Sequence, residues 1–271
     1  MPDNEPAPTI ETVGPLVIDR PLRVSRRADL VVQLSTDLNY SSNVLGLSNL
    51  PGGLELEAVD GYVWNKQVRL IGLVPVSGSV LLYAQAGLGH ATYFDQSTLD
   101  HFTVNAGAGA LFALSSMTRL NLAFSCSSER NEDFDEFYRL CQPSAAFTTA
   151  IGDPYTGTGV EFGLRGALAL GDREIFARYR EAAAHINFEA GGGLRFQLRP
   201  EARIRSYEVP TLFEAFDDTR TDYQASVRLG LFYEASSFSF GVAAVPRVNW
   251  SNLEQYRYWD VAGGPFLSVR F

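Results

Sequence analysis

Apolar and polar residues alternate along most of the chain, most clearly in its last third. From 259 to 271 the odd-numbered positions are mainly apolar, whereas the even-numbered positions include Asp260 and Arg270. The segments 238–250 and 223–233 alternate in the same way. Successive side chains of a strand point to opposite faces, so this period of two predicts strands with one apolar and one polar face. Each run is long enough for the roughly 9–11 residues of a tilted membrane strand.

The same pattern extends over nearly the whole chain. It predicts strands at 29–41, 60–76, 79–94, 101–115, 118–128, 158–171, 174–184, 186–199, 201–209, 221–234, 237–249 and 256–271. Residues 15–26 and 137–150 are candidates for two more strands. Single-chain membrane barrels favour even strand numbers, so we expect about 12–14 strands.

Turn residues divide the predicted connections into two groups. Short turns are predicted at 77–79, 115–117, 171–173, 199–201 and 235–237. Longer polar connections are predicted at 95–100, about 130–157, 208–220 and 250–256. Short turns at one rim and long loops at the other are typical of outer-membrane barrels, whose carboxyl terminus is periplasmic.

The polar face decides between a membrane barrel and a soluble sandwich or lipocalin-like barrel, which also alternate. In one strand Gly193, Arg195 and Gln197 oppose Leu194 and Phe196, and such a polar face would make a poor dry core. The sequence therefore predicts an all-β, transmembrane antiparallel β-barrel over residues 15–271.

Residues 1–14 are acidic and Pro-rich and lack the apolar segment of a signal peptide. We expect them to be a flexible tail or linker of a mature or trimmed chain.

Composition agrees with a barrel and excludes some partners. Of the 271 residues 46% are hydrophobic, yet mean hydropathy is only −0.04, because the apolar residues alternate with polar ones. The net charge of −9 argues against a nucleic-acid partner, which needs a basic face. Aromatic residues near predicted strand ends suggest an interfacial girdle. They are Tyr40, Tyr93, Tyr223, Trp250, Tyr256, Tyr258 and Trp259.

Charged residues lie on the predicted lumenal face of consecutive strands. The basic members are Arg165, Arg178, Arg180, Arg195, Arg203, Arg205, Arg228, Arg247 and Arg270. The acidic members are Glu161, Glu174, Glu189 and Asp260. Such charges set pore selectivity in some barrels and brace the wall by pairing in others, and the sequence leaves both interpretations open.

The two cysteines, Cys126 and Cys141, flank an acidic stretch at 129–136. In an oxidising compartment they are expected to form a disulfide that pins a long surface loop. The acidic stretch lacks the glycine and the spacing of a calcium loop, so a solvated loop is the expected structure.

Residues that could support catalysis are sparse. Outer-membrane phospholipases place a His and a Ser nucleophile two residues apart, and His90 with Thr92 has that spacing without a clear orienting Asn. His101 and His185 are isolated, so no metal site, cofactor or enzymatic activity is expected. The glycines at 191–193 are predicted to lie inside a strand.

Two segments carry a family resemblance. Residues 39–44 and 249–252 each place an aromatic, Ser and Asn at a strand end, and residues 256–271 form the last strand. Together they resemble the barrel domain of the surface lipoprotein assembly modifier (Slam) family and related barrels that follow tetratricopeptide repeats. The resemblance implies lipoprotein movement across the outer membrane, and an aromatic end such as Phe271 implies recognition by the barrel assembly machinery. This chain has no helical repeats of that kind.

Four functions follow as hypotheses. The first is translocation or assembly of surface lipoproteins, with outer-membrane lipid, the assembly machinery and exported lipoproteins as partners. The second is a porin-like channel for small polar or anionic solutes. A barrel-embedded hydrolase and an adhesive surface protein are the remaining alternatives.

Overall fold

Twelve antiparallel strands make up almost all of the described part of the chain in the computed structural model. The structure describes residues 28–43, 60–94, 97–131, 133–151, 158–171, 178–207, 220–235 and 237–271. The strands are β1 (Asp29–Ser41), β2 (Gly61–Pro75), β3 (Val80–Tyr93), β4 (His101–Ala113), β5 (Thr118–Arg130), β6 (Glu136–Ala150), β7 (Gly159–Gly171), β8 (Tyr179–Gly191), β9 (Leu194–Tyr207), β10 (Thr221–Glu234), β11 (Phe238–Ser251) and β12 (Tyr258–Arg270). Two short 3₁₀ turns, η1 (Ser97–Leu99) and η2 (Glu254–Tyr256), complete the elements.

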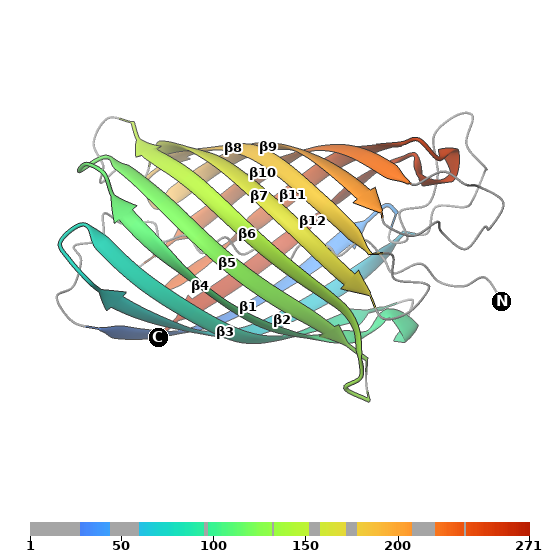
Figure 1. The fold of residues 1–271 in the computed structure, drawn as a ribbon, viewed down its shortest axis with the longest axis horizontal. Helices are drawn as coiled ribbons and strands as arrows, with labels where there is room; N and C mark the ends of the chain where they lie inside the picture. The colour runs from blue at the N-terminus through green and yellow to red at the C-terminus, as the bar shows by residue number, and fades with distance from the viewer. Residues whose placement is uncertain are drawn as a thin grey trace.

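The sheet closes on itself. Each strand pairs with its sequence neighbours, and β1 pairs with β12 through partners such as Gln33 with Arg270 and Ser41 with Ala262. Figure 1 shows the strands running obliquely around one cylinder. Closure satisfies the backbone groups that an open sheet would leave at its edges. No helix in the described part of the chain is long and apolar enough to cross a membrane.

The two rims differ. The carboxyl-terminal rim holds the carboxyl-terminal end of β12 and most short turns. These include the connections 76–79, 114–117 and 235–237. The opposite rim, called the loop rim below, carries the connections 42–60 and 208–220. The predicted grouping of short and long connections is therefore present for most strand pairs.

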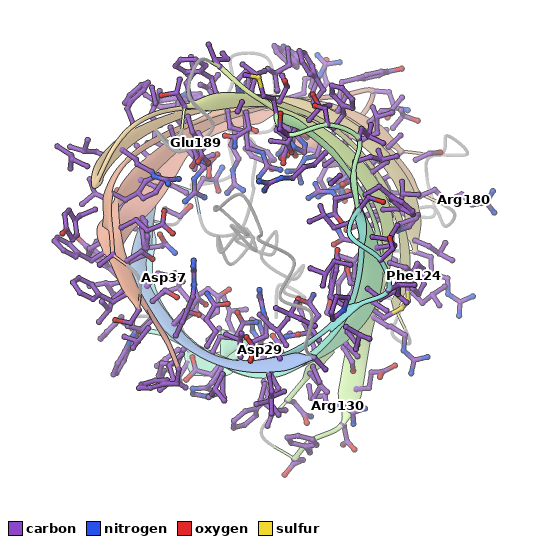
Figure 2. The ribbon with its side chains drawn as sticks, turned by 90° about the vertical axis from the view of Figure 1, so that its left-hand side faces the viewer. Asp29, Asp37, Phe124, Arg130, Arg180 and Glu189 are labelled. Carbon is purple, nitrogen blue, oxygen red and sulfur yellow. A yellow bond between two sulfur atoms is a disulfide. The ribbon has the colours of Figure 1, made fainter. Side chains whose placement is uncertain are left out.

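The outer face of the wall is apolar and the inner face is polar. Along β1, Leu30, Leu34 and Leu38 are exposed on the outside, whereas Gln33 is buried on the inside. Figure 2 shows Phe124 pointing away from the cylinder and Asp37 and Glu189 pointing into it. A soluble barrel would place its bulky apolar side chains inward, so this arrangement contradicts the soluble alternative.

The barrel has twelve strands, which is within the predicted range of 12–14, but some predicted strand boundaries were wrong. The candidate strand at 137–150 is confirmed as most of β6, so the long connection predicted at about 130–157 is not one loop. The three strands predicted between 174 and 209 are two, β8 and β9. Pro200, taken for a turn residue, lies within β9 opposite Val227, with its ring on the exposed outer face.

The true turn between β8 and β9 lies at the glycines predicted to be inside a strand. Gly191 has a φ of +125°, and a Cβ there would lie 2.2 Å from the carbonyl oxygen of Leu194. Only glycine combines that conformation with so close a backbone approach. The three consecutive glycines therefore mark a hairpin, not a bend.

Cys126 and Cys141 form a disulfide between directly paired positions of β5 and β6. Their Cα atoms are 4.1 Å apart, and both lie on the outward face that also carries Phe124. The bond was expected to pin a long surface loop; instead it joins two strands of the wall, because β6 begins at Glu136 and leaves only a short tip.

Breaking this disulfide is expected to lower stability without opening the barrel. The bond closes a segment with a sequence separation of 15 residues, for which the loss of unfolded-state entropy is worth about 3 kcal/mol. Urea unfolding of the Cys126→Ala/Cys141→Ala variant, and of the reduced protein, should give a free energy of unfolding that is lower by about this amount, and therefore a lower midpoint. Unchanged midpoints in both preparations would contradict a stabilising role.

The lumen as candidate functional site

The inward side chains surround one central cavity. It measures about 390 Å³ and is lined by residues of β2 through β12, such as Gln85, Asn105, Gln142 and Gln224. The wall is chemically uneven. On β2–β6 the inward polar residues are mainly amides and serines, whereas β7–β12 carry most of the charged groups.

Two glutamates, Glu181 on β8 and Glu201 on β9, are the centre of the charged wall, and their side chains are only 2% and 6% exposed. Arg165 on β7 donates to both carboxylates at 3.2 Å. Further donors are Arg205 to Glu181 at 2.5 Å, Arg203 to Glu201 at 2.6 Å and Arg199 to Glu201 at 3.3 Å. Four arginines therefore share two carboxylates. We call these six residues the arginine–glutamate hub.

Smaller polar and charged contacts continue the wall toward the carboxyl-terminal rim. His185 Nε2 lies 3.1 Å from Glu161, which also accepts a hydrogen bond from Thr148 at 3.0 Å. Arg195 lies 3.6 Å from Glu189 and 3.3 Å from Glu234. Charges are thus paired across neighbouring strands, which supports the bracing interpretation for this part of the wall.

The rim motifs that carried the family resemblance meet at Asp260, which is fully buried. Arg247 on β11 donates to both carboxylate oxygens of Asp260 at 2.5 Å. The Ser41 hydroxyl lies 3.3 Å from the same carboxylate, and Asn249 donates to the Tyr256 carbonyl at 2.7 Å. These residues tie the first strand to the last two near the loop rim.

Inward tyrosines line the lumen near the loop rim. The hydroxyls of Tyr138 and Tyr179 are 2.6 Å apart, and the Tyr179 and Tyr207 ring centroids are 5.4 Å apart. Arg220 lies over the Tyr207 ring at 4.2 Å and the Tyr256 ring at 3.5 Å. This buried aromatic and cationic row lies at the loop-rim end of the lumen, and the sequence pattern did not reveal it.

Two cavity arginines are hydrogen-bonded to neutral amides. Arg69 on β2 donates to the Gln67 side chain at 3.0 Å, and Arg228 on β10 donates to Gln197 at 2.8 Å. The cavity lining contains seven arginines, at 69, 165, 199, 203, 205, 228 and 247, against three glutamates, at 129, 181 and 201. The lining of this cavity therefore contains more arginines than glutamates, although the whole chain has a net charge of −9.

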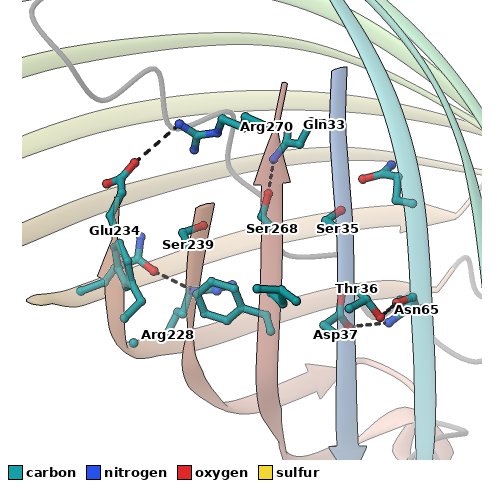
Figure 3. A pocket seen from close by; sticks show the side chains of 16 residues that line it. Gln33, Ser35, Thr36, Asp37, Asn65, Arg228, Glu234, Ser239, Ser268 and Arg270 are labelled. Atoms are coloured by element: carbon teal, nitrogen blue, oxygen red, sulfur yellow. Dashed lines mark hydrogen bonds and ion pairs between the residues drawn. The ribbon is translucent and has the colours of Figure 1, made fainter. Parts of the chain in front are cut away.

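A second, smaller cavity of about 60 Å³ lies between β1, β10 and β12 toward the carboxyl-terminal rim. Figure 3 shows its polar lining, with Gln33 bonded to Ser268 and Arg270 paired with Glu234. Asp37 accepts a hydrogen bond from Asn65 at 2.8 Å. Polar groups thus continue from the central cavity to this rim.

Most of the predicted lumenal residues face inward in the structure. They are Arg165, Arg195, Arg203, Arg205, Arg228, Arg247, Arg270, Glu161, Glu189 and Asp260. Arg178 and Arg180 were placed wrongly, since both are exposed on the outer face, where Figure 2 shows Arg180 pointing away from the barrel. Glu174, the tail 1–14, the candidate strand 15–26 and most of the loop 208–220 lie outside the described residues.

The error at Arg178 and Arg180 has a clear origin. Ending a strand at 184 separated these arginines from Ile186. Within 174–184 the large apolar residues Ile175 and Phe176 alternate to both faces, so they did not distinguish inside from outside. In the continuous strand β8, the exposed Ile186 fixes the even positions as outward. Glu181 and Glu201 were missed because of the same misplaced boundaries.

The structure also places the candidate hydrolase pair and the predicted girdle. His90 and Thr92 point outward, with 3.3 Å between Nδ1 and Oγ1, so they do not face the lumen. Tyr93, Tyr256 and Tyr258 are buried, unlike the exposed Trp250 and Trp259, so the outward girdle contains fewer residues than predicted. Within the described ranges no group of three His, Cys, Asp or Glu residues could hold a metal ion.

Comparisons with known proteins extend these findings. No protein-family model matches the sequence, and no curated protein matches it. The structure resembles the COG4313 outer membrane channel from Pseudomonas putida F1, with a TM-score of 0.64 and 10% identity over 89% of this chain and 95% of that chain.

Other solved barrels are less similar. The translocator domain of autotransporter NalP from Neisseria meningitidis gives a TM-score of 0.46 and 15% identity, covering 89% of this chain and 88% of that chain. The NanC porin gives a TM-score of 0.45 and 8% identity, covering 87% of this chain and 98% of that chain. The similarity to the COG4313 channel shows that this chain has a fold found in outer-membrane barrels. None of these findings shows the Slam family, so that resemblance stays a prediction.

Proposed function

We propose that this protein is an outer-membrane β-barrel that forms a channel for small anionic solutes. The observation that carries the proposal is the arginine excess around a central cavity inside an apolar cylinder. Charges that line a pore select ions of the opposite sign. The similarity in fold to an outer membrane channel agrees with this function without identifying a solute.

The proposed position in the bilayer follows from the difference between the apolar outer face and the polar inner face of the wall. Exposed leucines, valines and aromatic residues surround the wall, and the backbone of all twelve strands is paired. This is the arrangement that a hydrocarbon environment requires. In the proposed orientation the carboxyl-terminal rim is periplasmic. The exposed Phe271 lies there and would be accessible to the barrel assembly machinery during insertion.

Lipoprotein translocation remains the alternative from the family resemblance. The residues that carried that resemblance have another explanation in this structure, because Ser41, Asn249 and Asp260 make the contacts that join strands near the loop rim. A barrel that crosslinks to an exported lipoprotein and shows no conductance would favour translocation over the channel.

Purified barrel in planar lipid bilayers is expected to show steady conductance that prefers anions. In a potassium chloride gradient, the sign of the zero-current potential reports which ion carries the current. A silent barrel, or one that prefers potassium, would contradict the proposed function. Heat-denatured protein from the same preparation, which should not conduct, is the matched control.

A further inference from the structure

Charge is distributed unequally over the outward face of the barrel. In the half of each described strand nearest the carboxyl-terminal rim, every outward side chain is uncharged. In the half nearest the loop rim, five outward basic residues occur on or beside β2, β5, β6 and β8. They are Lys66, Arg130, Arg139, Arg178 and Arg180, and we call them the basic band.

Strand pairing places the members of this band in register. Lys66 on β2 pairs with His90 on β3, His90 pairs with Phe102 on β4, and Phe102 pairs with Arg130 on β5. The band therefore follows a row of paired positions across four strands.

The row continues on the next strands. Arg139 on β6 pairs with Leu170 on β7, and Arg180 on β8 pairs with Leu168. Arginines on β6 and β8 therefore flank exposed leucines of β7, at about two strand spacings, or roughly 10 Å, from each other. Glu136 contacts the band, at 3.4 Å from Arg130 and 2.8 Å from Arg139.

Lys66, the single lysine of the chain, is held by neighbouring side chains. Its ammonium donates to the Thr92 hydroxyl at 3.1 Å and lies 4.1 Å from the Trp64 ring centroid. Trp64 is nearer the loop rim on the same strand, so the ammonium reaches back toward that rim, as lysines do at a membrane interface.

We propose that the basic band binds the phosphate groups of anionic lipids in the outer leaflet. Guanidinium groups form paired hydrogen bonds with phosphate oxygens, and the exposed leucines of β7 lie where acyl chains would pack. Charge complementarity selects a phosphate-bearing lipid over a neutral one. The inference rests on the membrane position given under Proposed function, but not on conductance.

Native mass spectrometry of the detergent-purified barrel with phosphatidic acid tests the inference. The variant Arg139→Gln/Arg178→Gln/Arg180→Gln should bind this lipid at least about tenfold more weakly, since each basic residue near an anionic surface contributes on the order of a fivefold effect. The double variant Arg119→Gln/Arg257→Gln removes charges outside the band and should bind like the wild type.

Three outcomes decide between the possibilities. Equal binding by the triple variant and the wild type would overturn the lipid site. Binding of glycerol phosphate with the affinity of phosphatidic acid would also overturn it, by indicating a free-phosphate site. Conductance is recorded on the same preparations, so a conducting barrel without lipid preference refutes only this inference, and a lipid-binding barrel without conductance refutes only the channel.

Discussion

Replacing Arg69 and Arg228 together by glutamate is expected to reverse the ion preference of the channel. These arginines line the cavity from two separate parts of the wall, β2 and β10, so a change in their charge acts on the solute path. A unit charge a few ångströms from a solute ion in water is worth about 1 kcal/mol. Each arginine-to-glutamate change alters the charge by two, so the anion-to-cation permeability ratio should fall by tenfold or more.

The measurement is the zero-current potential in a potassium chloride gradient, whose sign should change. Arg69→Gln/Arg228→Gln should give an intermediate value without the change of sign. The matched control is Arg257→Glu, because Arg257 lies beside η2 at the loop rim outside the cavity lining. If the double glutamate variant kept the wild-type potential, the cavity charges would have no role in selectivity.

Neutralising Glu181 and Glu201 is expected to cause the largest loss of stability. Both carboxylates are nearly buried, and together they accept from Arg165, Arg203 and two further arginines. Removing one partner of a buried ion pair costs on the order of 3–5 kcal/mol, and the remaining guanidinium groups would then repel one another. Glu181→Gln/Glu201→Gln should therefore unfold at markedly lower urea concentration.

A compensating substitution tests the prediction for the arginine–glutamate hub. Adding Arg203→Met to the double variant removes one of the crowded charges and should recover part of the lost free energy of unfolding. Glu254→Gln is the matched control, since that carboxylate is 61% exposed and its ion pair with Arg257 should contribute less than about 1 kcal/mol. A double variant as stable as this control would show that the hub does not brace the wall.

The sequence predicted the barrel because alternation is a local signal that each strand repeats. In β12, bulky residues such as Trp259 and Leu267 leave one interpretation of which face is outward. In β8 the half near the loop rim contains mainly alanines and charged residues, and its faces follow only from Ile186 further along the strand. Orientation is thus predictable where large apolar residues occur and ambiguous where they are absent.

The pairing within the lumen was less predictable. Arg165, Glu181 and Glu201 lie on three different strands, and their contacts depend on the register between those strands. Register is set by turn geometry and by packing of the whole wall, so a shift of two residues would preserve each face and change every ion pair. A list of inward charges can therefore be read from the sequence, but their pairing cannot.

Closure between β1 and β12 has a consequence for how the molecule forms. The two strands that complete the cylinder are separated by more than 200 residues of chain, as in the pairing of Gln33 with Arg270. Contacts between such distant segments form late and slowly, because a long stretch of chain must first be ordered. A nascent chain that stops before β12 would retain two unpaired edges, so biogenesis should discard truncated products instead of accumulating smaller barrels.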